Sequence, residues 1–228
     1  MVKKTGLMVL AVLMLLTSGN GILAQARTEF GLKGGVARTD IVGDDTSDLS
    51  HKSGAVFGGF ASLKLTRFFA LQPELLYAQK GANADAYSTG FLGESVQTSL
   101  RFHYLEVPVL LKFVIPTSGN LNPAVYVGPA LNVKLRAVAH QDLLGNSMDQ
   151  KIGNIKATDF SLVMGFGGDF QMYSTRVVLD FRLNVGLGRF TTVVDNVGIQ
   201  DDIYLIDEEG NPLNWRHTGF RAMAGVVF

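Results

Sequence analysis

The sequence contains no cysteine, which excludes a disulfide framework, a thiolate nucleophile and a Cys-ligated metal. Stability in an oxidising compartment would therefore have to come from the fold itself. An excess of one charge is also missing, because 20 Lys and Arg residues balance 20 Asp and Glu residues. With no overall field to attract a polyanion, we expect no nucleic-acid partner.

Long apolar runs are scarce as well. The run from Leu7 to Leu16 is only about half of the ~20 residues that a helix needs to cross a bilayer. Lys3 and Lys4 precede it, and the small-residue stretch after it ends in Ala24-Gln25-Ala26. This order is typical of a secretory signal peptide rather than of an N-terminal membrane anchor. We predict a signal peptide over 1–26, with cleavage after Ala26 or after Ala24, and a single mature domain over 27–228.

What the chain has instead is glycine, with 26 residues, and apolar residues that recur with a period of two. In the clearest stretch Val177, Leu179 and Phe181 share one face, while Asp180 and Arg182 share the other. A period of two indicates β-strands with one apolar and one polar face. Eight such segments are present: Phe30–Ala37, Gly54–Lys64, Leu71–Lys80, Leu105–Phe113, Val125–Leu135, Phe160–Phe170, Arg176–Arg189 and His217–Phe228.

The connections between these segments alternate in length. Polar stretches at 38–53, 81–97, 138–157 and 191–216 are long, and the links at 65–68, 116–122 and 173–175 are short. The pattern predicts an all-β fold, a closed antiparallel eight-stranded transmembrane β-barrel with up-and-down meander topology. We expect it in the cell outer membrane, in contact with lipid, with four long extracellular loops and both mature termini in the periplasm. The alternative is a soluble barrel of the lipocalin kind, but the many charges on the polar face favour the membrane form.

The polar face of an eight-stranded barrel points into a lumen that its own side chains can fill. Both signs of charge occur there, so the side chains can pair across the lumen. We therefore predict a plugged interior, and the alternative is a narrow path or gate for ions. The predicted lumen charge network consists of Glu74, Glu106, Lys112, Lys134, Asp180, Arg182 and Arg221.

Catalytic candidates are few. His51 lies two residues from Ser53, and His103 lies near Ser99, but the spacing places no acidic orienting group beside either histidine. The acidic runs 44–48, 201–202 and 207–209 lack the spacing of a calcium loop. We assign no catalytic residue, no cofactor site and no metal site.

The stretch 191–216 is the least ordinary connection. Ile203–Ile206 and Pro212–Trp215 flank a polar segment, which predicts a hairpin with its turn at Gly210-Asn211. Tyr204 and Trp215 would then be exposed aromatic contacts for a partner or residues of the interfacial aromatic girdle.

The last predicted strand ends in Phe228, with Phe220 and Val226 at alternate positions before it. This ending resembles the signal that the barrel-assembly machinery reads in outer-membrane proteins. Together with the motifs Phe30–Val36, Leu71–Tyr77 and Tyr104–Phe113, it resembles the outer-membrane β-barrel family of Gram-negative bacteria labelled porin family or PorT-like. The resemblance implies fold and location over almost the whole mature chain.

Four functional hypotheses follow. The first is a non-enzymatic integral barrel with a structural role, or one that binds an extracellular or envelope protein through its loops. The second is a narrow porin-like channel for ions or small solutes, and the third, suggested by the PorT-like resemblance, is a component of a protein-secretion assembly. The fourth is a lipid-modifying outer-membrane enzyme, which would need His, Ser and acidic side chains to converge.

Overall fold

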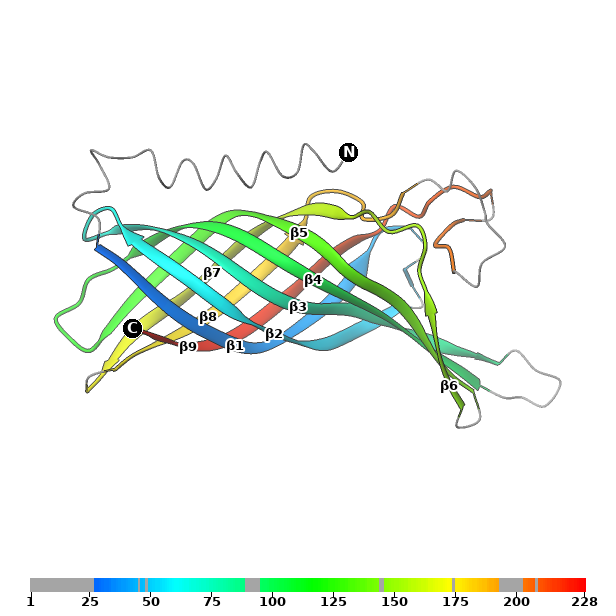
Figure 1. Cartoon of the computed structure of the whole chain (residues 1–228), viewed down its shortest axis with the longest axis horizontal. Helices are drawn as coiled ribbons and strands as arrows, with labels where there is room; N and C mark the ends of the chain where they lie inside the picture. Colours follow the sequence, from blue (N-terminus) through cyan, green and yellow to red (C-terminus); the bar gives the residue numbers. More distant parts are fainter. Residues whose placement is uncertain are drawn as a thin grey trace.

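The computed structural model describes residues 27–44, 46–47, 49–88, 95–143, 146–173, 175–192, 203–207 and 209–228. Within these ranges the chain forms nine strands and no helix (Figure 1). The strands are β1 (Arg27–Val42), β2 (Leu49–Lys64), β3 (Phe69–Ser88), β4 (Ser95–Val114), β5 (Leu121–Leu143), β6 (Asn146–Lys151), β7 (Thr158–Met172), β8 (Thr175–Gly186) and β9 (Arg216–Val227). The predicted signal peptide 1–26 lies outside the described residues, so it stays a prediction.

Eight of these strands form a closed barrel. Each barrel strand pairs antiparallel with the barrel strand that follows it in the chain, and β1 pairs with β9 from Gly31↔Val227 to Val42↔Arg216. β7 pairs with the first half of β5, whereas the short β6 pairs with the far end of β5 as a hairpin extension. Closure leaves no barrel strand with an unpaired edge, which lipid would penalise. The predicted eight-stranded antiparallel meander is confirmed.

Three of the predicted long loops are wrong, because they are mostly strand. β3 and β4 have 20 residues each and β5 has 23, roughly twice the 9 to 11 that a tilted strand needs to cross a bilayer. β1 and β2 likewise extend through most of 38–53. In these extensions the apolar alternation fades, since neither face contacts lipid, and so the sequence pattern missed them. Figure 1 shows the β3–β4 and β5–β6 hairpins projecting from the barrel end opposite to its short turns.

Side-chain direction separates the membrane barrel from its soluble alternative. Phe30 is 61% exposed, Phe166 62% and Phe220 67%, although all three are large and apolar. Charged groups such as Glu74 and Glu106 are instead buried inside. An apolar outer surface around a polar interior is the arrangement of an outer-membrane barrel. Among the residues described, no helix is long and apolar enough to cross a membrane.

Candidate functional site

The middle of the lumen holds a charge-balanced cluster of four side chains, Lys33, Glu74, Asp180 and Arg182, which we call the middle layer. Arg182 donates to both carboxylates: Nη1 lies 2.7 Å from Oε2 of Glu74, and Nε lies 2.7 Å from Oδ1 of Asp180. Nζ of Lys33 lies 2.7 Å from Glu74 and 2.9 Å from Asp180. The Tyr126 hydroxyl also donates to Asp180. With Tyr126, the five side chains come from four strands, β1, β3, β5 and β8, so the bonds from Glu74, Lys33 and Tyr126 to the β8 residues cross the lumen.

Gly165 makes room for this layer. It lies on β7, opposite Tyr126 on β5 and Arg182 on β8. A Cβ at this position would lie 2.6 Å from Cε2 of Tyr126 and 3.1 Å from Cγ of Arg182, which is closer than packed carbons approach. The missing side chain therefore lets the arginine and the tyrosine lie side by side on the inner wall.

A second group, the upper layer, lies closer to the extended hairpins and contains Lys80, Glu106 and Arg221. Arg221 binds Glu106 in bidentate geometry, with Nη2 2.8 Å from Oε1, and Nζ of Lys80 lies 2.7 Å from the same oxygen. Bidentate guanidinium–carboxylate pairs are among the stronger ionic contacts in proteins. With Glu106 completely buried, the pair is shielded from solvent.

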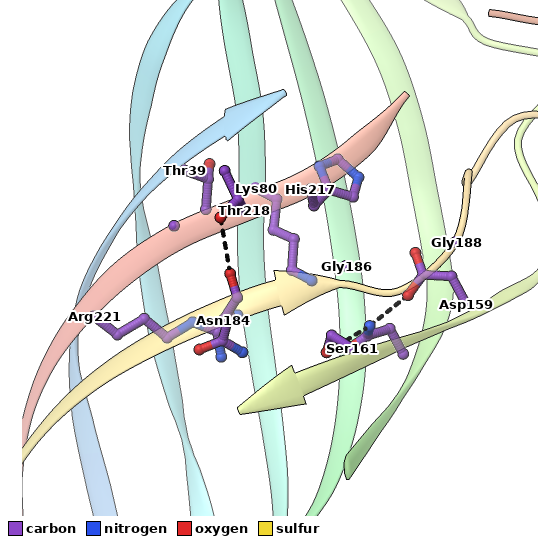
Figure 2. A pocket seen from close by; sticks show the side chains of 12 residues that line it. Thr39, Lys80, Asp159, Ser161, Asn184, Gly186, Gly188, His217, Thr218 and Arg221 are labelled. Atoms are coloured by element: carbon purple, nitrogen blue, oxygen red, sulfur yellow. Dashed lines mark hydrogen bonds between the residues drawn. The ribbon is translucent and has the colours of Figure 1, made fainter. Parts of the chain in front are cut away.

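A small polar cavity borders the upper layer (Figure 2). Lys80, Arg221, Asp159, Asn184 and His217 line it, and its volume of about 10 Å³ is the space that one water molecule needs. Asn184 accepts a hydrogen bond from Thr218 through its backbone oxygen, 3.2 Å away. The cavity is thus lined by polar side chains, and it is too small for a solute larger than water.

The end of the lumen near the short turns contains a third set of ion pairs. Nζ of Lys64 lies 2.7 Å from Glu29, and Arg176 binds the other oxygen of the same carboxylate. Lys112 pairs with Asp169 at 2.8 Å. This layer is more open than the other two, because the Lys64 side chain is 36% exposed.

The predicted network residues therefore fall into separate groups. Glu74, Asp180 and Arg182 meet in the middle layer, and Glu106 meets Arg221 in the upper layer. Lys112 contacts Asp169 instead of either predicted glutamate, and Lys134 donates to the backbone oxygen of Ile155 at 2.6 Å. Lys134 lies in register with Tyr104, two residues beyond Glu106 along β4, where a connecting segment supplies the oxygen of Ile155 instead of a carboxylate.

The sequence reasoning also missed two cations of the network, Lys33 and Lys80. Lys33 bridges Glu74 and Asp180 from β1, and Lys80 contacts Glu106 from β3. Strand alternation placed both lysines on the polar face, which was the available signal. Alternation does not show which charges on that face share a level along the barrel axis.

Apolar side chains cover the upper layer on the side of the extended hairpins. Phe102 and Tyr104 point inward from β4, and connecting segments pack over them; we call this cluster the cap. Its other large members are Ile41, Leu100, Ile152, Ile155, Phe190, Leu205 and Trp215. The Phe190 ring stacks on His217 at 4.0 Å between centroids. The cap thus fills the barrel end that the charge layers leave free.

Trp215 corrects a prediction, because it is 5% exposed and belongs to the cap rather than to an exposed surface or a girdle. Its indole N–H donates to the backbone oxygen of Asp44 at 2.7 Å, which satisfies the polar atom of the buried ring. Tyr204 is half-buried. The predicted turn is present, with Gly210 at φ 83° and Ile206 bridged to Pro212, and the segment is joined to the connection after β6 through the Ile152↔Ile203 bridge.

Because Trp215 is the only tryptophan, its fluorescence reports on the cap directly. We expect the folded protein to emit at shorter wavelength than free tryptophan and to resist quenching by acrylamide. Leu205→Ala, which removes a cap neighbour, should shift the emission to longer wavelength, whereas Leu187→Ala on the outer face should not. An unshifted, readily quenched emission in the folded wild type would contradict a buried Trp215.

The predicted histidine candidates lie apart from the lumen layers. The Arg38 guanidinium lies 2.8 Å from Nδ1 of His51, and the Tyr77 hydroxyl contacts Nδ1 of His103. Nδ1 of His140 contacts Asp149 at 2.6 Å, without a nucleophile in that pair. In the described part of the chain, no group of three or more His, Asp or Glu residues could hold a metal ion.

The outer apolar surface, the polar lumen and the closed antiparallel sheet define the class of outer-membrane β-barrels. The sequence profile of the family described as outer membrane protein beta-barrel domain matches residues 23–192. The chain therefore belongs to this family, and the outer membrane is its location. The matched region ends before β9, although β9 closes the sheet. The narrower PorT-like label stays a prediction.

Several solved outer-membrane proteins resemble the chain at low identity. Neisserial surface protein A is 14% identical with a TM-score of 0.44, and 86% of this chain covers 96% of it. Ail of Yersinia pestis, solved with the heparin analogue sucrose octasulfate, is 12% identical with a TM-score of 0.41, at 89% and 99% coverage. OprG from Pseudomonas aeruginosa is 10% identical with a TM-score of 0.45, at 91% and 99% coverage. No curated protein is similar enough to the chain to count as a match.

Proposed function

We propose that this protein is a non-enzymatic outer-membrane barrel with a lumen closed to solutes, and that it acts through the surface of its extended hairpins. The observation that carries the proposal is that three successive layers of side chains block the lumen along its axis. The middle and upper layers cross it with short ion pairs, and the cap then covers the upper layer. A solute path would have to break both the ion pairs and the apolar packing.

The proposed orientation puts the extended hairpins outside the cell and both mature termini in the periplasm. The β2–β3 and β7–β8 connections lie at the end where β1 begins and β9 ends, as short periplasmic turns do in barrels of this class. The hairpins β3–β4 and β5–β6 leave the opposite end. They would therefore offer the largest surface to an extracellular or envelope protein partner.

The arrangement of the histidines supports the proposed lack of catalysis. His51 and His103 contact an arginine and a tyrosine rather than a serine and a carboxylate. His217 lies inside the cap, stacked on Phe190 and 6% exposed, so a lipid substrate could not reach it. None of these contacts resembles a base beside an activated nucleophile.

The C-terminal strand supports recognition by the barrel-assembly machinery as a partner during biogenesis. Phe220, Val226 and Phe228 are exposed on the outer face of the closing strand. The Phe228 N–H donates to the backbone oxygen of Phe30 at 2.8 Å, so the last residue still belongs to the β1–β9 seam. Phe228→Ser should lower the amount of folded protein in the outer membrane several-fold, while purified protein refolds in detergent like the wild type.

Liposome swelling tests the closed lumen against the narrow-channel alternative for solutes. Liposomes containing the refolded protein are placed in isosmotic solutions of small sugars and amino acids. The closed barrel predicts the swelling rate of protein-free liposomes. Swelling that depends on protein content and on solute size would instead establish a channel.

A further inference from the structure

The exposed apolar side chains on the outer surface of the barrel form an apolar belt. Cations gather on the outer face of the extended hairpins, immediately past this belt. Along β4 the outward side chains change from Leu105 to His103 and then to Arg101. Arg136 on β5 pairs in register with His103, and Lys151 on β6 lies opposite Val138, the partner of Arg101. The outer faces of β4 and β5, which are apolar along the barrel, thus become basic in the extended hairpins.

Lys52 joins this surface from β2 by crossing its neighbour. A Cβ at Gly81 on β3 would lie 2.1 Å from the backbone oxygen of Leu100 and 2.8 Å from Cδ of Lys52, so the glycine leaves room for the aliphatic part of the lysine. Nζ of Lys52 then reaches Asn83 at 3.3 Å and also Ser99 on β4. Burial, and next the nearby Arg101 guanidinium, lower the pKa of Lys52. The fold therefore holds the positive charges of Lys52 and Arg101 close together, and their repulsion costs free energy.

Part of this surface, without Lys151, forms a groove of about 410 Å³, which we call the basic groove. Its lining includes Lys52, Gln79, Arg101, His103, Arg136 and Asp149. Asp149 is its one acidic side chain, and it already binds Arg136 at 3.2 Å and His140 at 2.6 Å. Hydrogen bonding from His140 lowers the pKa of Asp149. Among the residues described, no carboxylate lies within ion-pair distance of Lys52 or Arg101.

The groove lies at the level along the barrel where the headgroups of a lipid leaflet are expected. Its lower border is aromatic, since the Tyr77 hydroxyl contacts His103 and the Tyr77 ring packs on Phe57 at 5.0 Å between centroids. Aromatic side chains mark the interface in outer-membrane barrels. Directly below lie exposed apolar side chains such as Leu75 and Leu135, which are 54% and 55% exposed.

We propose that the basic groove binds the phosphate groups of a phosphorylated glycolipid in the outer leaflet, whose acyl chains lie along the apolar belt beneath it. Guanidinium and ammonium groups are the usual protein ligands for phosphate. A lipid is favoured over a soluble anion because the groove borders the exposed apolar surface: His103 in its lining contacts Tyr77, and Arg136 in its lining follows the exposed Leu135, so one molecule can contact both surfaces. This inference rests on the proposed orientation, in which the extended hairpins face outward.

The test is a titration of the full refolded barrel in detergent micelles with bisphosphoryl lipid A as the probe. Lys52→Gln/Arg101→Gln should weaken binding about tenfold, because it removes two unpaired cations and breaks no described ion pair. The matched control is Lys156→Gln/Arg189→Gln, which removes two cations near the same barrel end but outside the groove. It should change the affinity less than twofold.

Two further binding measurements distinguish a phosphorylated lipid from a soluble phosphate as the ligand. The wild type should bind fully dephosphorylated lipid A about tenfold more weakly, and inorganic phosphate at millimolar concentration should not displace the bisphosphoryl form. Equal affinity for both lipids would overturn the proposal, and so would displacement by inorganic phosphate or by a soluble sulfated oligosaccharide. Such a failure would leave the closed lumen intact, since liposome swelling measures that independently.

Discussion

Arg182→Met should destabilise the barrel by about 3–5 kcal/mol, because it removes the cation that binds both carboxylates of the middle layer. Lys33 would then face Glu74 and Asp180 alone, which leaves one buried negative charge without compensation. A methionine can fill part of the volume but offers no donor. The free energy of unfolding is measured by urea titration in lipid vesicles, with the mobility of unboiled samples on a gel as the readout.

Two variants make this result specific to the charge. Arg189→Met removes an exposed arginine and should cost less than about 0.5 kcal/mol, as surface substitutions usually do. Arg182→Met/Glu74→Met restores the charge balance and should recover part of the loss, since apolar groups can replace a buried pair. A loss below about 1 kcal/mol for Arg182→Met would mean that water hydrates the lumen carboxylates, against the closed interior.

Gly165→Val should cost about 2–3 kcal/mol, near the upper end of the usual range for overpacking. The new side chain would meet the backbone oxygen of Phe181 at 2.3 Å, overlap Tyr126 and press on Arg182 on the inner wall. Because those two groups hold Asp180, the strain reaches the charge layer as well. The same urea titration measures the loss.

Gly34→Val is the matched control, because a Cβ at Gly34 would meet its nearest atom, Cβ of Phe57, at an ordinary 3.5 Å. The same substitution outside the lumen should change the stability by less than about 1 kcal/mol. Equal losses at both glycines would indicate a general effect of removing glycine from a strand rather than crowding of the middle layer.

The sequence was sufficient for the fold because the bilayer imposes a strict alternation. Leu179 and Phe181 had to face lipid, so Asp180 and Arg182 had to face the lumen, and closure followed from eight such segments. The extended hairpins were not predicted, since beyond the belt both strand faces contact water or protein. In these extensions the alternation of apolar and polar residues no longer distinguishes a strand from a polar loop.

The candidate site was only partly predictable for a similar reason. The polar face contained Lys33, Glu74 and Asp180, but their common level depends on strand stagger around the barrel, which single-strand periodicity does not contain. Lys134 was assigned to the wrong partners because it lies in register with Tyr104, beyond Glu106, and binds a backbone oxygen of a connecting segment. The cap was missed because Trp215 and Phe190 come from connecting segments, where burial depends on long-range packing.

Single-channel current through the refolded protein in a planar bilayer tests the closed lumen most directly. Gel mobility that differs between boiled and unboiled samples first establishes that the inserted protein is folded. The ion-pair layers and the cap predict no steady current in the wild type. A steady current that changes in Glu106→Gln or in Arg182→Met would contradict the closed lumen and identify the protein as a narrow channel.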